Sequence, residues 1–238
     1  RVTSDTRTQD DEPPVGYAAV GSSYYPVLVG AFTGLVLISN ITATKAVAFG
    51  PIVGDWSLIT DGGFILFPLT YVIGDVLSEV YGFRATRRAI YTGFLMQALA
   101  ALAFWVTIFL PAAAFYSNQE SLRAVVGAST ILIIAGLAGF ICGQTINSWV
   151  VVKIKARTKE KHLWARLIGS TIVGELADTV VFCSIAAHAI GITTARDFLT
   201  YVIIGWIYKT LVEVVILPVT YRVIAHIKRH EPTYRPAE

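Results

Sequence analysis

Residues 64–92 read FILFPLTYVIGDVLSEVYGFRATRRAIYT, an apolar run that contains two acids, Asp75 and Glu79, and ends in a cluster of arginines. Carboxylates inside a membrane span are costly and are rarely present without a task. A second acidic pair, Glu175 and Asp178, lies in another apolar run. The two pairs predict a polar site inside the bilayer, and therefore transport of a polar molecule.

The composition of the whole chain also indicates a membrane protein. Apolar residues make up 55% of the 238 residues and charged residues only 15%, whereas charged residues are about a quarter of a soluble domain. The hydrophilic start has no apolar core of the kind that a signal peptide needs. We expect a flexible polar cytoplasmic tail over 1–24, a transmembrane transporter domain over 25–228 and a second cytoplasmic tail over 229–238.

Six apolar segments are long enough to cross a bilayer, which takes roughly 20 helical residues. Their apolar runs are continuous rather than alternating, which favours helices over a β-barrel. The predicted fold is therefore an all-α membrane protein with six transmembrane helices. The predicted spans are 25–49, 58–80, 88–116, 121–153, 163–190 and 198–226.

Basic residues predict the orientation of these spans. The connections after the first, third and fifth spans hold only Arg123 and Arg196. Because basic residues favour the cytoplasmic side, both termini are predicted to be cytoplasmic. The basic cluster at 153–166 is interpreted as this topology signal beside lipid headgroups, not as a nucleic-acid site. Most of the other basic residues lie near or after the ends of the second, fourth and sixth spans: Arg84, Arg87, Arg88, Lys153, Lys155, Arg157, Lys159, Lys161, Arg166, Arg222, Lys228, Arg229 and Arg235.

The same basic residues mark the membrane surface and serve as a depth ruler, because the number of helical residues from them gives the depth of another side chain in the bilayer. Five polar side chains each lie nine residues from a basic residue, a rise of about 14 Å, close to half the hydrocarbon thickness. Transporters commonly bind substrate at this depth, between helices. The five are Asp75, Gln97, Gln144, Glu175 and Glu213, and within a turn of them lie Glu79, Asp178 and Asn147.

Amide side chains in this set have an alternative role. Gln97, Gln144 and Asn147 can instead form hydrogen bonds between helices, worth about 0.6 kcal/mol each on average. Asn40 lies about 22 Å along the first span from its start, in the outer half. Lys45 follows near the outer surface, where it can snorkel outward or line an entrance.

Acidic side chains also have structural alternatives. Lys209 and Glu213 are four residues apart and can neutralise each other on one helix face. Glu79 can lie near the headgroups and pair with Arg84 or Arg87. By contrast, Asp75, Glu175 and Asp178 have no basic neighbour in the sequence on their apolar side, which favours a functional role for these three.

Other motifs are less informative. Cys142 and Cys183 lie in separate spans without metal-ligand spacing, and no histidine belongs to an HExxH motif. We therefore predict no metal, no cofactor and no enzymatic activity. The GxxxG spacings at Gly30–Gly34 and Gly139–Gly143 predict close helix packing.

Four stretches of this chain resemble the queuosine precursor transporters, also described as a putative vitamin uptake transporter family. The resemblance covers about 25–228, although many members have Gln where this chain has Glu175. The stretches run from Ser39-Asn40 to Lys45, from Phe67 to Gly82 with its arginines, from Gly143-Gln144 through Asn147 to Lys155, and from Leu163 to Thr179.

The resemblance implies import of 7-cyano-7-deazaguanine or 7-aminomethyl-7-deazaguanine across a bacterial inner membrane. It also implies a fold like the substrate-binding components of energy-coupling-factor vitamin importers. A subunit that needs a separate energising module therefore remains an alternative, and a homodimer is left open.

The chemistry of a guanine-like ring suits the polar set. A carboxylate, Asp178 or Glu175, can accept the N–H donors of its pairing edge, and an amide, Asn147 or Gln144, can bind the remaining polar edge. Aromatic side chains such as Tyr71 or Trp149 can cover the ring faces.

Overall fold

The computed structural model describes residues 16–21, 24–43, 45–53, 56–126, 130–159, 161–187 and 192–235. Five of its helices, α1, α2, α4, α5 and α6, are long and apolar enough to cross a membrane. The elements are α1 Tyr24–Thr42, β1 Ala46–Val53, β2 Trp56–Asp61, α2 Leu66–Phe109, α3 Gln119–Val126, α4 Thr130–Thr158, α5 Leu163–Ala186 and α6 Ala195–His230.

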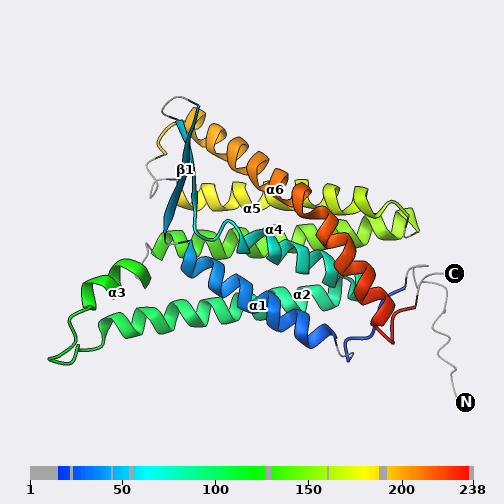
Figure 1. The fold of residues 1–238 in the computed structure, drawn as a ribbon, viewed down its shortest axis with the longest axis horizontal. Coiled ribbons are helices and arrows are strands. Elements are labelled where there is room, and N and C mark those ends of the chain that lie inside the picture. Colours follow the sequence, from blue (N-terminus) through cyan, green and yellow to red (C-terminus); the bar gives the residue numbers. More distant parts are fainter. Residues whose placement is uncertain are drawn as a thin grey trace, which may run out of the picture.

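Helix α2 contains a sharp break at Gly82, whose φ of 76° and ψ of 173° are not helical. A side chain here would be strained by the positive φ and would also lie 3.2 Å from the ring of Tyr17. The two arms of α2, 66–81 and 83–109, turn back on each other at this point (Figure 1). The connection predicted between the second and third spans is thus a single non-helical residue.

The long helices run between two ends of the bundle (Figure 1). One end, here called the terminal end, holds the start of α1, the break at Gly82, the turn between α4 and α5 and the end of α6. Residues near both chain ends meet there, since Ala19 N donates to Thr233 Oγ1 at 3.0 Å. The opposite end, here called the hairpin end, carries β1, β2 and α3.

A two-stranded antiparallel hairpin stands where helices were expected. Strands β1 and β2 pair Ala46 with Asp61 and Phe49 with Leu58, so the predictions that the first span reaches 49 and the second begins at 58 are wrong. The physical reason is local: Gly50-Pro51 cannot continue a helix, and the following WSLITD is rich in residues that favour strands.

The fourth predicted span also begins too early. Residues 119–126 form the separate helix α3, in which Arg123 and Glu120 pair at 3.3 Å with both side chains exposed. This stretch is too polar to lie in an apolar span, and α4 begins at Thr130. The predicted end of the fifth span at 190 lies outside the described residues.

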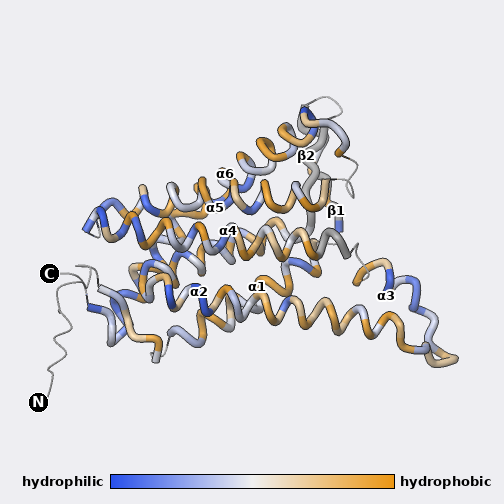
Figure 2. Tube along the Cα trace, turned by 180° about the vertical axis from the view of Figure 1, so that it is seen from behind, coloured by the Kyte–Doolittle hydropathy of each residue, from blue (hydrophilic) through white to orange (hydrophobic). Residues whose placement is uncertain are grey.

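Hydrophobic residues make up much of the length of the long helices (Figure 2). On the second arm of α2, Leu95, Leu99 and Leu102 are each more than half exposed. Exposed apolar surface on this scale marks contact with a membrane or another protein. Hydrophilic stretches gather at the terminal end and on α3 (Figure 2).

Residues 16–21, part of the predicted N-terminal tail, lie against the bundle. Ala18 is buried, and its N–H donates to Val80 O at 2.8 Å. At the other chain end, Glu231 is buried and accepts a hydrogen bond from Tyr81 Oη at 2.8 Å. Residues 1–15, 22–23 and 236–238 of the predicted tails lie outside the described part.

Glycines let α4 and α5 approach closely. A Cβ on Gly143 would lie 2.9 Å from Gly174 O and 2.6 Å from Asp178 Cβ, and one on Gly139 would lie 2.7 Å from Asp178 Oδ1. This confirms close packing at Gly139–Gly143. At Gly30–Gly34 an added Cβ would meet no described atom within 4 Å, so the same prediction is wrong there within this chain.

Candidate functional site

A lysine and two carboxylates form the first level of a polar cluster inside the bundle. Lys209 of α6 donates a short hydrogen bond to Asp178 Oδ2, and its Nζ lies 3.4 Å from Glu175 Oε2. Both acids are on α5 and nearly inaccessible. The prediction that Lys209 neutralises Glu213 on its own helix is therefore wrong, because Lys209 reaches across to α5.

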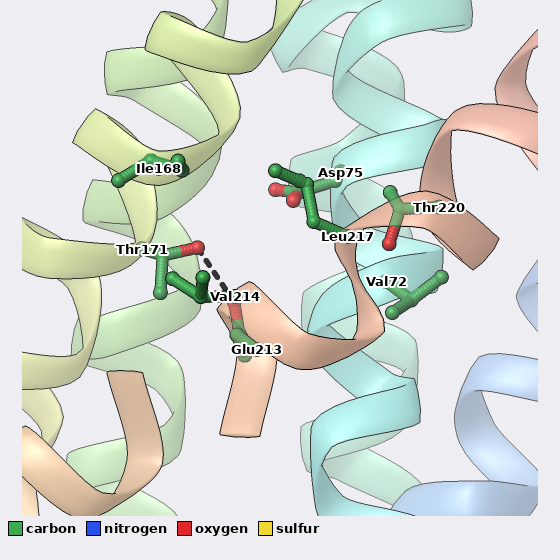
Figure 3. Close-up of a pocket in the computed structure, with 8 residues that line it drawn as sticks. All are labelled: Val72, Asp75, Ile168, Thr171, Glu213, Val214, Leu217 and Thr220. Atoms are coloured by element: carbon green, nitrogen blue, oxygen red, sulfur yellow. Dashed lines mark hydrogen bonds between the residues drawn. The ribbon is translucent and has the colours of Figure 1, made fainter. Parts of the chain in front are cut away.

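Two further carboxylates form a second level. Asp75 Oδ1 accepts a hydrogen bond from Asn147 Nδ2 at 2.8 Å, and Glu213 Oε2 accepts one from Thr171 Oγ1 at 2.5 Å. Both acids line one narrow pocket between α2, α5 and α6 (Figure 3). Val72 and Leu217 contribute apolar walls.

The two levels are one helical turn apart. Thr171 and Glu175 are separated by four residues on α5, and Lys209 and Glu213 by four residues on the antiparallel α6. Because a helix rises 1.5 Å per residue, the levels are about 6 Å apart. The acids thus form a continuous polar column along the inside of the bundle.

Several buried atoms of this column have no hydrogen-bond partner among the described residues. An unpaired buried polar group costs about 1–3 kcal/mol, so their hydrogen-bonding capacity suits a polar ligand. Tyr71 is fully buried and one turn from Asp75, whereas Trp149 is 48% exposed. The atoms of the column without a hydrogen-bond partner are Tyr71 Oη, Gln144 Oε1 and Nε2, Asn147 Oδ1, Glu175 Oε2, Thr179 Oγ1 and Glu213 Oε1.

Glu79 lies one turn from Asp75 but belongs to a different cluster. Arg166 donates from Nε to Oε2 at 2.7 Å and from its second terminal nitrogen to Oε1 at 2.6 Å. Lys228 Nζ donates to Oε1 at 2.6 Å, and Lys155 Nζ lies 3.8 Å away. This ion cluster joins α2, α4, α5 and α6.

The ion cluster replaces the pairing expected for Glu79. Its partners come from other helices and not from Arg84 or Arg87, so that prediction is wrong. Lys155 also donates to the carbonyl oxygens of Glu79 at 2.6 Å and of Gly16 at 2.9 Å. The cluster therefore ties the N-terminal segment to the terminal end of the bundle.

Asn40 is not brought into the column, and no hydrogen bond among the described residues joins Gln97 to it. Asn40 is exposed, and its Nδ2 donates to Val36 O of its own helix at 3.0 Å. Gln97 is buried on the second arm of α2, with its Oε1 unpartnered among the described residues. The other four residues of the depth ruler do gather: Asp75, Gln144, Glu175 and Glu213.

Sequence reasoning missed Thr171 and the role of Lys209. A lysine in an apolar span is as costly as a carboxylate there, so Lys209 carried a usable signal. Thr171 carried none, because a lone threonine in a membrane helix usually bonds to its own backbone.

The bundle of long apolar helices around an interior polar column is that of a multi-pass membrane protein. A family model described as "Putative vitamin uptake transporter" matches residues 61–223. The chain belongs to this family, which is one of transporters and not of enzymes.

Two curated relatives are similar to the chain. One, from Bacillus subtilis (strain 168), is named "Probable queuosine precursor transporter" and is 31% identical over 163 residues, 67% of this chain and 69% of the relative. The other, from Haemophilus influenzae (strain ATCC 51907 / DSM 11121 / KW20 / Rd), has the same name and is 22% identical over 207 residues, 87% of this chain and 85% of the relative. No solved structure matches the chain, so the expected likeness to vitamin-importer components stays a prediction.

Proposed function

We propose that the chain imports a queuosine precursor, 7-cyano-7-deazaguanine or 7-aminomethyl-7-deazaguanine, into the bacterial cytoplasm. The observation that carries this proposal is the column of buried, partly unpartnered acids and amides between α2, α4, α5 and α6. A transported base offers donors and acceptors to such a column. The names of both relatives support the same substrate class.

In this proposal the first level binds the pairing edge of the base. Asp178 and Glu175 accept its N–H donors, and Gln144 and Asn147 bind the remaining polar edge. Tyr71, fully buried beside Gly143, covers part of a ring face. Lys209 then holds the two acids in place and balances part of their charge.

Binding must open the bundle. The pocket beside Asp75 and Glu213 has a volume of about 10 Å³, which is room for about one water molecule. Sites for small organic ligands are commonly about 300–1,000 Å³. We therefore infer that α6, which carries Glu213 and Lys209 and closes one side of the pocket, moves when the base enters.

Ligand binding is the direct test of this function. A purified, detergent-solubilised chain should melt at a higher temperature with either deazaguanine, because a ligand that binds only the folded state stabilises it. At a hundred times the dissociation constant the gain is about 2.7 kcal/mol. Adenine, whose pairing edge reverses the donor pattern, serves as the control ligand. Equal stabilisation by adenine would contradict recognition of a guanine edge.

We further propose that the chain crosses the membrane six times, with both termini in the cytoplasm. The two arms of α2 supply two crossings, and the basic residues after the second, fourth and sixth crossings lie at the terminal end. This assignment places the ion cluster around Glu79 on the cytoplasmic side.

Cysteine labelling tests this topology. Phe115 is 91% exposed and lies at the hairpin end. In a background with Cys142→Ala and Cys183→Ala, the variant Phe115→Cys should react with a membrane-impermeant maleimide added to whole cells. Arg157→Cys, near the exposed end of α4, should react only after the membrane is opened. The reverse pattern would contradict the proposed orientation.

A further inference from the structure

We propose that Asp75 and Glu213 form a cation subsite, so that the chain prefers a base bearing a primary ammonium group over its neutral nitrile counterpart. The inference rests on the proposed function and deepens it. The 7-aminomethyl substituent is a primary amine that carries a positive charge at neutral pH, whereas the 7-cyano substituent is uncharged. A negatively charged subsite that contacts this substituent therefore favours the amine over the nitrile.

The balance of charge inside the bundle points to such a subsite. Lys209 is the basic partner of the first level, and Glu175 and Asp178 already engage it. The second level has two acids whose observed partners are neutral: Asn147 for Asp75 and Thr171 for Glu213. No basic residue lines the pocket in the described part of the chain.

One buried carboxylate oxygen of this level has no partner among the described residues. Glu213 is 8% exposed, its Oε1 has no hydrogen-bond partner among the described residues, and its side chain lines the pocket opposite Asp75 (Figure 3). A buried charge without an opposite charge is strongly unfavourable. An ammonium group donates up to three hydrogen bonds, which matches two carboxylates facing each other.

The spacing of the levels suits one ligand that spans both. They are about 6 Å apart along α5 and α6. In a 7-substituted deazaguanine the substituent lies beside O6 and across the fused rings from the 2-amino group. A base whose 2-amino group binds Asp178 and Glu175 therefore directs its substituent away from these two acids, toward Asp75 and Glu213.

Isothermal titration calorimetry on the purified full chain at neutral pH tests the subsite. Wild type should bind 7-aminomethyl-7-deazaguanine at least tenfold more tightly than 7-cyano-7-deazaguanine, because a hydrogen bond to a charged group is worth roughly ten- to a hundredfold in affinity. Glu213→Gln should weaken binding of the amine at least tenfold and leave binding of the nitrile within about twofold. The control Glu120→Gln, on an exposed side chain of α3, should change neither affinity.

The other outcomes distinguish failure of the subsite from failure of the proposed function. Equal affinities for amine and nitrile in wild type, or equal losses for both in Glu213→Gln, would overturn the subsite while the proposed function stands. Failure of wild type to bind either base would instead refute the proposed function, and the subsite with it. If Glu213→Gln does not give a folded protein by size-exclusion chromatography and thermal melting, Asp75→Asn is compared in its place, with the same two outcomes.

Discussion

Replacing Glu79 by glutamine is expected to destabilise the bundle by about 3–5 kcal/mol. The Glu79 side chain is fully buried and pairs with Arg166, which is 1% exposed, and with Lys228. Glutamine keeps the shape but removes the charge, so Arg166 and Lys155 would remain buried without their counter-charge. The loss appears as a lower midpoint of thermal unfolding in detergent.

A matched pair on the surface provides the control for Glu79. Glu120 also pairs with an arginine, Arg123, at 3.3 Å, but both side chains are exposed. Exposed ion pairs contribute little, so Glu120→Gln should leave the unfolding midpoint almost unchanged. If the two variants melted at the same temperature, the ion cluster would not hold the terminal end together.

Asp178→Ala is expected to abolish uptake of the deazaguanine while the protein still folds and inserts. Loss of a charged acceptor leaves a ligand donor unpaired, which costs about 1.5–3 kcal/mol, or roughly ten- to a hundredfold in affinity. Lys209 would keep Glu175 as an ionic partner at 3.4 Å. The lysine is therefore not left as an isolated buried charge.

A conservative variant separates charge from geometry at this position. Asp178→Asn should retain part of the binding if the side chain acts through its shape, and lose it if the charge matters. Asp197→Asn, at an exposed acid near the start of α6, controls for a general effect of removing an acid. Normal binding and uptake by Asp178→Ala would place the pairing-edge site elsewhere, with Asp75 next in line.

Much of the bundle follows from long apolar runs in the sequence. The predicted starts at 25 and 163 lie within one residue of the starts of α1 and α5, whereas the predicted start at 121 lies well before α4, which begins at Thr130. The hairpin at 46–61 was missed because an apolar stretch of eight residues suits a helix and a strand equally, and only Gly50-Pro51 argued for a break. Likewise, hydropathy carries no information on the positive φ of Gly82, which folds α2 back on itself.

The polar column was partly predictable. Counting residues from the basic side chains predicted the same depth for Asp75 and Glu213, and these two acids share a pocket. Ion pairing was not predictable, because spacing along one helix reveals only neighbours on that helix. Lys209 pairs with Asp178, and Glu79 pairs with Arg166. Both partners are on α5, 31 and 87 residues away in the sequence.

Uptake by the purified chain alone tests directly whether the interior column carries a deazaguanine across the membrane. Proteoliposomes that contain only this chain should take up labelled 7-aminomethyl-7-deazaguanine above empty liposomes, with saturation and with competition by unlabelled base. Repeating the assay with and without a pH gradient would show whether protons drive the uptake. Absence of uptake by folded, reconstituted protein under both conditions would contradict a self-sufficient transporter of this substrate.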